Sequence, residues 1–445
     1  MKRIPWFLVL IILWSIILLT PTNLEIKLSL LVLSLCIILW TSEIIPMWIT
    51  GLIPLILGPL LGLILFEEIV KNYFSGILLL FISGFIFSSA VSKWKIDKKI
   101  VFSIMSIFGK NARLTILGVI ISTALLSTLM ANTTTTALML PIGLGILTAI
   151  KGEGKEYRTS LLLSIAYAAS IGGTGILIGT TTNLIGAEYM MRENMEIGFL
   201  AWAKIVMPFT LTLLAVLWLY MSWRTKLPKK IVIDIKKIKL DSHAKLVIFV
   251  LLLTVLAWLL RPYVSEKTGF QLNDIMIGLL GSLSLFLIRY KNKPLLRIKD
   301  VKIPWNIILM VGGALALGNI LLNVGMSDIF VQVMGFLPRN ELVFLIATAV
   351  IANFSTELIS NTALSATLIP VIVQLYKSAG FDPFLGILTV AVCSDMAFML
   401  PIATPPNAIV YKSKYVNFRK MVSYGFLLNI IVIVLWVLYA SVFLM

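Results

Sequence analysis

The sequence is poor in the residues that most enzymes use for chemistry. Among its 445 residues are 2 cysteines and 1 histidine, and only 13% of the residues are charged. Cys36 and Cys393 lie far apart in apolar segments, which indicates small core residues rather than a metal site or a redox pair. The sequence has neither a His-Glu-x-x-His nor a Gly-x-Ser-x-Gly motif, and a serine mechanism would need a base that it does not offer. These absences argue against an intramembrane enzyme.

Hydrophobic residues dominate instead. They make up 59% of the chain, and the mean hydropathy is +1.02, more than one soluble core can hide. Apolar runs of the ~20 residues that cross a ~30 Å hydrocarbon layer recur about ten times. The first run follows Met1-Lys2-Arg3 without an Ala-x-Ala-like cleavage site, so we expect it to be a span rather than a signal peptide. The sequence therefore predicts an all-α polytopic membrane protein.

The distribution of positive charge predicts the topology. The formal net charge is +17, but Lys and Arg lie mostly in short loops, which points to an anionic membrane surface rather than to nucleic acid. About eleven spans are expected, at residues 5–20, 26–45, 47–66, 75–92, 158–188, 203–224, 244–261, 273–290, 305–335, 383–411 and 420–445. With the N-terminus in the cytoplasm, the Lys-rich loops at 93–110, 151–158, 224–245, 289–302 and 411–420 also lie inside. The C-terminus then lies outside.

One polar pattern occurs twice in this apolar chain. Residues 131–142 read Ala-Asn-Thr-Thr-Thr-Thr-Ala-Leu-Met-Leu-Pro-Ile, and residues 360–371 read Ser-Asn-Thr-Ala-Leu-Ser-Ala-Thr-Leu-Ile-Pro-Val, a shift of 360 − 131 = 229 positions. Amides and hydroxyls are costly inside a membrane unless they find partners. The simplest reason to carry two copies is that they bind something polar, which predicts a transporter built on an internal duplication.

The alternation of the loops requires two re-entrant hairpins. Segments 113–150 and 341–378 must each enter and leave on one side, the first from the cytoplasm and the second from the opposite face. Such opposed hairpins are typical of inverted-topology repeats, and their polar tips should line a site because a broken helix at mid-membrane needs protein or water around it. Residues 95–110 are expected to form a cytoplasmic amphipathic helix.

Two further interruptions follow the hairpins, at residues 172–183 and 401–407. They are rich in Gly and Pro, so we expect unwound loops between half-helices, with Asn183 and Asn407 in corresponding positions. Half-helix N-termini suit an anion, and carbonyl and side-chain oxygens suit a small cation. No Lys, Arg or His lies in the two hairpin tips or in the two unwound loops, so an anion would be held by Asn, Thr, helix dipoles and co-bound cations.

These elements divide the chain into five parts. They are a scaffold part at 1–110, a transport part of the first repeat at 111–224, a basic cytoplasmic linker at 225–243, a scaffold part of the second repeat at 244–337, and a transport part of the second repeat at 338–445.

Several polar residues have a structural as well as a functional interpretation. Glu357 is either a structural partner of a nearby amide, which we favour, or a proton or cation site. Each threonine of 133–136 either bonds its own helix or faces the substrate. Gly172, Gly173 and Gly175 either break the helix or only allow close packing. His243 is expected to be solvated, and Glu43 to be an interfacial or packing residue.

These motifs together resemble one transporter family. Ser360-Asn361-Thr362 with Pro370, Asn132-Thr133 with Pro141, Thr41-Ser42-Glu43 and the two breaks are similar to the divalent anion/sodium symporters, the INDY-type dicarboxylate transporters. The resemblance covers nearly the whole chain. It implies a homodimer with scaffold and mobile transport domains, an elevator mechanism, C4-dicarboxylates (succinate, malate, fumarate) or citrate as substrate, and sodium as coupling ion with no organic cofactor.

The resemblance also implies roles for individual residues. The first sodium site would use Ser127, Asn132 and Gly179, and the second Thr356, Asn361, Ala403 and Pro405. The substrate would meet Asn132, Thr133, Thr180, Asn361, Thr362 and Thr404. The chain departs from the family at Ala131, where serine is common, and at Thr181-Thr182, where Pro-Pro is frequent. Because Ala131 has no hydroxyl, the first sodium site could be weaker, or coupling could differ.

The functional expectation is sodium-coupled dicarboxylate import across the plasma membrane. Alternatives on the same fold are dicarboxylate exchange, proton coupling through Glu357, and transport of inorganic oxyanions such as sulfate. A channel fits less well, because opposed hairpins suit alternating access better than a continuous pore.

Overall fold

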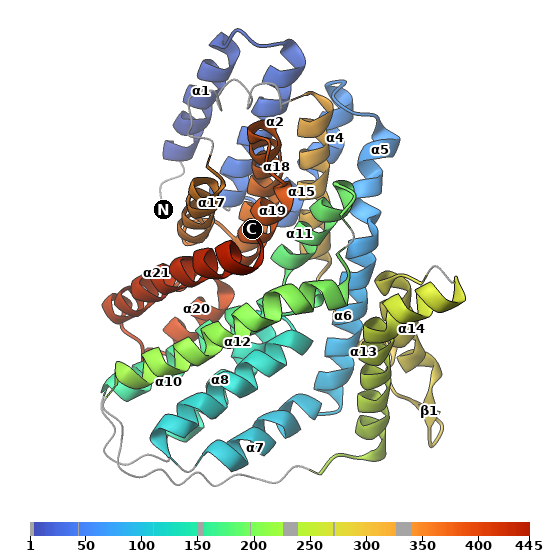
Figure 1. The fold of residues 1–445 in the computed structure, drawn as a ribbon, viewed down its shortest axis with the longest axis vertical. Helices are drawn as coiled ribbons and strands as arrows, with labels where there is room; N and C mark the ends of the chain where they lie inside the picture. The colour runs from blue at the N-terminus through green and yellow to red at the C-terminus, as the bar shows by residue number, and fades with distance from the viewer. Residues whose placement is uncertain are drawn as a thin grey trace.

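The computed structural model describes residues 4–42, 44–109, 111–148, 155–195, 197–225, 239–269, 272–325 and 340–445. The described part is almost wholly helical, apart from a small antiparallel pair of β1 (Arg289–Tyr290) and β2 (Lys293–Pro294) (Figure 1). Seven of its helices are long and apolar enough to cross a membrane, and five shorter apolar helices accompany them. The expected all-α membrane fold is therefore confirmed. Glu43, most of the basic linker 225–243 and the end of the span 305–335 lie outside the described residues.

The N-terminal third contains mostly whole helices. They are α1 (Ile4–Leu19), α2 (Leu24–Ser42), α4 (Ile53–Leu60), α5 (Phe66–Lys71) and α6 (Gly76–Lys93), with short turns α3 (Met47–Thr50) and η1 (Asn72–Phe74). The span expected at 47–66 is interrupted between α3 and α4. There Gly51 packs against the backbone of the helix that carries Leu309; a β-carbon on Gly51 would come within 2.7 Å of the Leu309 carbonyl oxygen. The sequence showed no sign of this contact, because it depends on a distant segment.

Two helical hairpins occupy opposite halves of the molecule, as expected. The first consists of α8 (Ala112–Leu129) and α9 (Asn132–Thr148), and the second of α17 (Glu341–Ser355) and α18 (Asn361–Ala379). In Figure 1 the first lies in the lower half beside α7 (Ile96–Phe108) and the second in the upper half. Each hairpin turns just before its Asn-Thr pair, and the second arm begins at the asparagine. The inverted arrangement brings the two tips to the middle of the molecule.

Both predicted broken helices are broken. The first runs as α10 (Lys155–Thr174), the 3-10 turn η2 (Leu177–Gly179) and α11 (Thr181–Arg192), and the second as α19 (Pro383–Cys393) and α20 (Pro405–Lys412). The second half of each broken helix packs against the other repeat. Helix α11 of the first repeat packs against α18 and α19, and α20 of the second repeat packs against α9 and α10. The two repeats are therefore interlocked around the tips.

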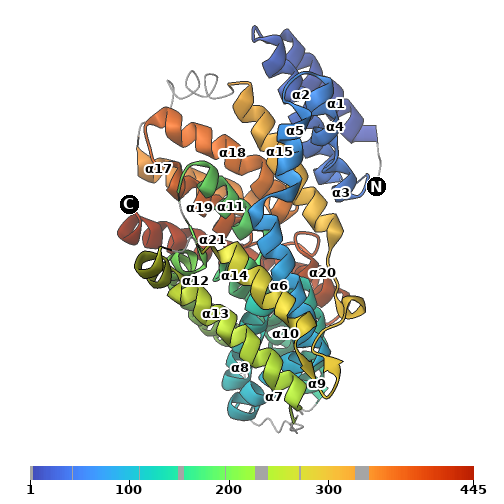
Figure 2. The same cartoon turned by 90° about the vertical axis from the view of Figure 1, so that its right-hand side faces the viewer.

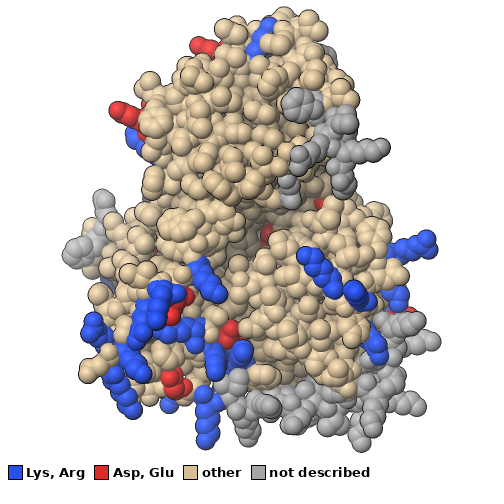
Figure 3. Space-filling model, turned by 180° about the vertical axis from the view of Figure 1, so that it is seen from behind, with Lys and Arg blue, Asp and Glu red and all other residues tan. Residues whose placement is uncertain are grey.

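The remaining helices enclose these elements. They are α12 (Phe199–Trp223), α13 (Ser242–Thr268), α14 (Asp274–Leu287), α15 (Trp305–Asn323) and α21 (Phe418–Phe443), with the 3-10 turn η3 (Ile298–Asp300). Helix α14 lies along α6, and α13 packs against both (Figure 2). Lys and Arg gather at one end of the molecule, the end of α7 and β1 (Figure 3). Large apolar side chains such as Phe249 and Leu252, exposed by 61% and 64%, suit a surface that faces lipid.

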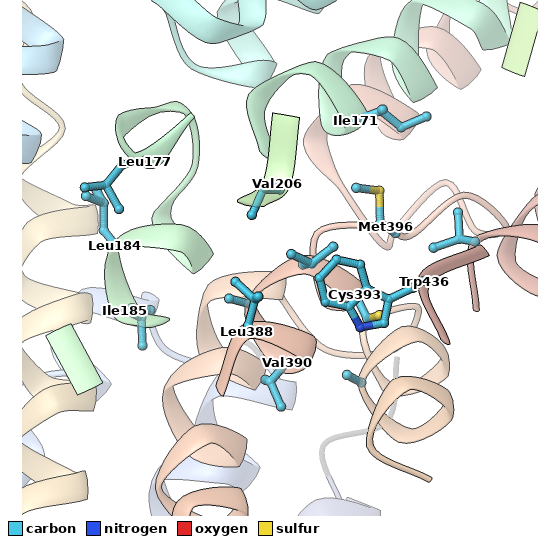
Figure 4. Close-up of a cluster of buried hydrophobic side chains, with 14 of the residues drawn as sticks. Ile171, Leu177, Leu184, Ile185, Val206, Leu388, Val390, Cys393, Met396 and Trp436 are labelled. Atoms are coloured by element: carbon cyan, nitrogen blue, oxygen red, sulfur yellow. The ribbon is translucent and has the colours of Figure 1, made fainter. Parts of the chain in front are cut away.

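The core lies where the broken helices meet α12 and α21. Ile171, Val206, Leu388 and Trp436 come from four different helices and belong to one cluster of buried hydrophobic side chains (Figure 4). The indole nitrogen of Trp436 donates to the Thr389 hydroxyl at 3.0 Å, which satisfies a polar group that is wholly buried. Both cysteines are buried and unpaired, as expected from their apolar surroundings.

The expectation that His243 is solvated was wrong. Its ring stacks on Trp94 at 4.4 Å between centroids and meets Tyr290 edge-on at 5.1 Å, so only 13% of the side chain is exposed. The imidazole also lies 3.3 Å from a carboxylate oxygen of Asp241. Residues distant in sequence create this pocket, and the linker sequence alone gives no sign of it.

Candidate functional site

A cavity of about 790 Å³ lies where the two hairpin tips and the two helix breaks meet. All six predicted substrate-binding residues line it, namely Asn132, Thr133, Thr180, Asn361, Thr362 and Thr404. Three of the predicted sodium-site residues, Gly179, Ala403 and Pro405, also line it. Of the other four, Asn132 and Asn361 are the cavity asparagines, and Ser127 and Thr356 contact these asparagines. The fold thus brings every predicted site residue to one place.

Ser127 and Asn132 form a polar cluster with the first broken helix. The Ser127 hydroxyl lies 2.6 Å from the Asn132 amide oxygen and 2.6 Å from the Ala169 carbonyl oxygen. The second repeat contains the same cluster. There the Thr356 hydroxyl lies 2.7 Å from the Asn361 amide oxygen and 2.6 Å from the Ser394 carbonyl oxygen.

The two clusters have more acceptors than hydrogens. A hydroxyl carries one hydrogen, so it can donate to only one of the two oxygens beside it, and the other oxygen–oxygen contact lacks a hydrogen. A small cation resolves such a surplus of lone pairs, because it binds hydroxyl, amide and carbonyl oxygens together. The residues present therefore fit sodium.

Two other asparagines hold the helix breaks in shape. The Asn183 side-chain nitrogen donates to the carbonyls of Thr174 and Ile176 at 3.1 and 2.8 Å. In the second repeat the Asn407 nitrogen donates to the carbonyls of Ala397 and Leu400, both at 3.0 Å. These bonds replace helical ones that the breaks remove, so the unwound backbone is satisfied inside the protein.

The hydroxyls at the starts of the second half-helices act as N-caps. Thr180 accepts from the Asn183 backbone N–H at 3.4 Å, and Thr404 accepts from that of Asn407 at 3.2 Å. Between the repeats, the Thr181 and Thr362 hydroxyls lie 2.6 Å apart. Thr181 thus joins the first break to the second hairpin tip.

Glu357 has the structural role that we favoured. Its carboxylate accepts from the backbone N–H groups of Phe398, Met399 and Leu400 at 2.7, 2.8 and 2.9 Å. The Asn429 side chain donates a fourth hydrogen bond at 2.8 Å. These contacts tie the second hairpin to the second break, where the backbone lacks helical partners.

The glycines of the first break serve close packing. A β-carbon on Gly172 would clash with the Ala124 backbone, and one on Gly173 would come within 2.6 Å of the Asn132 amide oxygen. A β-carbon on Gly179 would clash with the Gly173 carbonyl. The packing interpretation therefore holds for Gly172 and Gly173, and these contacts seat Asn132 against the break. Among the threonines, Thr136 bonds its own helix through the Asn132 carbonyl at 2.8 Å, whereas Thr133 lines the cavity.

Asp395 is the acidic residue of the site that the sequence patterns did not reveal. Its Oδ1 accepts from the Asn361 side-chain nitrogen at 3.1 Å, its Oδ2 lies 3.1 Å from the Thr174 hydroxyl, and Asn132 is a third hydrogen-bonding partner. It is 3% exposed and is the single charged residue among the described residues that line the cavity. The available signal was a lone acid within the apolar run 383–411.

Comparison with known proteins agrees with this architecture. A family model described as citrate transporter (CitMHS) matches residues 37–391 of the chain. The chain belongs to this family. This transporter is 31% identical over 429 residues to the sodium-dependent dicarboxylate transporter SdcS of Staphylococcus saprophyticus. The aligned region covers 90% of this chain and 82% of that protein. It is 29% identical over 433 residues to SdcS of Staphylococcus aureus, covering 90% and 83%.

A solved structure shows the same fold. The crystal structure of the YdaH transporter of Alcanivorax borkumensis superposes with a TM-score of 0.56 at 14% identity, covering 85% of this chain and 88% of that one. These relatives confirm the resemblance to the divalent anion/sodium symporters. They also confirm that this multi-pass membrane protein is a transporter rather than an enzyme.

Proposed function

We propose that this transporter imports C4-dicarboxylates such as succinate, malate and fumarate, or citrate, across the plasma membrane in symport with sodium. The observation that carries the proposal is the pair of asparagine-centred oxygen clusters on the cavity wall. Relatives named as sodium-dependent dicarboxylate transporters support both the substrate class and the coupling ion.

The substrate site in this proposal is neutral apart from Asp395. Helices α9, α11, α18 and α20 all begin at the cavity, so the partial positive charge of their N-termini favours carboxylates there, and α9, α11 and α18 also offer free N–H groups. Thr181 and Thr182 retain backbone N–H groups that a Pro-Pro pair would lack. The side chains of Asn132, Thr133, Asn361 and Thr362 then orient the two carboxylates, together with Thr180 and Thr404.

Sodium supplies the positive charge that the protein does not. The first ion would be held by Ser127, Asn132 and the Gly179 region, and the second by Thr356, Asn361, Ala403 and Pro405, partly through carbonyl oxygens. Two bound sodium ions would offset the charge of a divalent anion in a cavity without Lys, Arg or His among its described lining residues.

Alternating access would use the five parts of the chain. The transport parts at 111–224 and 338–445 would move as an elevator against the scaffold parts at 1–110 and 244–337, within a homodimer. The N-terminus would be cytoplasmic and the C-terminus outside. Exposed Lys95, Lys98 and Lys293 at one end of the molecule support that orientation.

Exchange of one dicarboxylate for another is a second candidate, and Ala131 favours it. With no hydroxyl at this position, the first sodium site has one oxygen fewer. Proton coupling through Glu357 gains no support, because its carboxylate is occupied by three backbone N–H groups and Asn429.

The test is uptake of labelled succinate by the reconstituted protein. Sodium and potassium gradients are compared, and unlabelled malate, fumarate, citrate and sulfate compete. We expect uptake in sodium that the dicarboxylates block. Counter-transport of dicarboxylates without sodium would show that the protein is an exchanger. Stronger block by sulfate than by the dicarboxylates would show that inorganic oxyanions are the substrates. No uptake under any ion gradient would refute transport of these anions.

A further inference from the structure

Asp395 occupies the point where the two repeats meet. It belongs to the second break, and it contacts Asn361 from the second hairpin, Thr174 from the first broken helix and Asn132 from the first hairpin. The corresponding residue of the first repeat, 225 positions earlier (395 − 225 = 170, as Ser394 corresponds to Ala169), is Ser170. The carboxyl group is therefore a single feature shared by both asparagine clusters.

The contacts of Asp395 determine which way the asparagine amides face. A side-chain amide has an oxygen on one side and a nitrogen on the other, and it can turn over with little change in shape. A carboxylate accepts hydrogen bonds, so each amide turns its nitrogen toward Asp395. The amide oxygens of Asn132 and Asn361 must then face the Ser127 and Thr356 hydroxyls, as they do.

Without the carboxylate, the opposite orientation would satisfy the clusters better. A turned Asn361 would donate from its nitrogen to the Thr356 hydroxyl, and the lack of hydrogens in the cluster would disappear. The same holds for Asn132 beside Ser127. A cluster that presents N–H groups in place of an oxygen no longer suits a cation.

We propose that Asp395 is a positioning residue that turns the amide oxygens of Asn132 and Asn361 toward the two sodium sites and thereby sets sodium affinity in both. The inference rests on the proposed sodium coupling. It assigns Asp395 no contact with sodium or substrate.

The test is the sodium-dependent thermal stabilisation of the purified protein, with choline replacing sodium at constant ionic strength. In Asp395→Asn the residue at position 395 is no longer a pure acceptor, so the amides of Asn132 and Asn361 need not turn their nitrogens toward it. We expect the sodium concentration at half-maximal stabilisation to rise about 10- to 100-fold, which is the effect of removing groups that orient metal ligands. Asp395→Ser should behave alike. Thr174→Val is the matched control, since it removes a neighbour of Asp395 but leaves the carboxylate and the amides, and it should stay within about threefold of the parent.

A double variant separates orientation from a general loss of structure. Asp395→Asn combined with Asn361→Asp exchanges the two groups, so the carboxylate at position 361 presents oxygen to the sodium site whichever way it turns. We expect this variant to fold and to regain most of the sodium response of the parent. The inference would be overturned if sodium stabilised the double variant no better than it stabilises Asp395→Asn. Where the single variants do not fold, a double variant that sodium does not stabilise would overturn it as well.

The outcomes also distinguish this inference from the proposed function. A parent protein with neither sodium stabilisation nor sodium-driven uptake would refute the coupling itself. If sodium stabilises the parent protein and the Asp395→Asn variant with the same half-maximal sodium concentration, only the positioning role is refuted.

Discussion

Ser127 and Thr356 make the same two contacts in the two repeats. Each hydroxyl lies 2.6–2.7 Å from the amide oxygen of the asparagine five positions later and 2.6 Å from a backbone carbonyl of the broken helix in its own repeat. A duplicated sequence thus folds into a duplicated oxygen cluster. Because the repeats are inverted, the two clusters approach one cavity from opposite halves of the protein.

Removing either hydroxyl should weaken sodium coupling. We expect Ser127→Ala or Thr356→Val to raise the sodium concentration for half-maximal uptake by about tenfold or more, because a direct oxygen ligand matters at least as much as the groups that orient it. Uptake measured over a sodium series checks this. Thr367→Val is the control, since its hydroxyl bonds only its own helix; an equal shift in the control would contradict the assignment.

Adding a hydroxyl at the first tip should strengthen coupling. Ala131→Ser supplies an oxygen beside Asn132, and one further polar contact is worth about 0.5–1.5 kcal/mol. The sodium requirement should therefore fall by about 2- to 10-fold. The same titration of uptake tests it, with Ala131→Gly as a control that adds no oxygen. An unchanged sodium requirement would mean that position 131 does not face the ion.

Replacing Glu357 should reduce stability without changing the pH dependence of transport. Glu357→Gln loses the charge that attracts three backbone N–H groups and places an amide nitrogen among donors, at a cost of about 1–3 kcal/mol for each unsatisfied bond. Thermal unfolding in detergent measures the loss. Glu156→Gln, which breaks a half-exposed pair with Lys420, should change stability by less than about 1 kcal/mol. A flattened pH profile of uptake in Glu357→Gln would instead make this residue a proton site.

Enlarging Gly179 should disrupt the first break. A β-carbon there would clash with the Gly173 carbonyl, and overpacking of this kind costs about 1–3 kcal/mol or more. We expect Gly179→Ala to lose uptake and melt at a lower temperature. Gly145→Ala on α9 meets nothing within 4 Å, so it should be neutral or slightly stabilising. Equal melting temperatures for the two variants would contradict the close contact.

Local chemistry explains which features the sequence could predict. The hairpin tips and helix breaks are marked by Asn-Thr, Gly and Pro residues within apolar runs, and the structure places them where expected. The structural role favoured for Glu357, a buried acid just before the second hairpin tip, is confirmed by its backbone and Asn429 donors.

The features that escaped prediction depend on contacts between distant segments. Trp94 and Tyr290 cover most of the His243 side chain, and the backbone at Leu309 approaches Gly51 closely. Asp395 has no acidic counterpart in the first repeat, so a search for duplicated patterns passes over it. Only the three-dimensional fold shows that it joins both asparagine clusters.

The most direct test of the account is calorimetric titration of succinate into the purified protein in sodium and in potassium. The oxygen clusters predict that succinate binds in sodium, that potassium does not replace it, and that Asn132→Ala and Asn361→Ala each weaken binding. Succinate binding of equal affinity in potassium would contradict the account, because the anion would then be held without the ions that the clusters are proposed to bind.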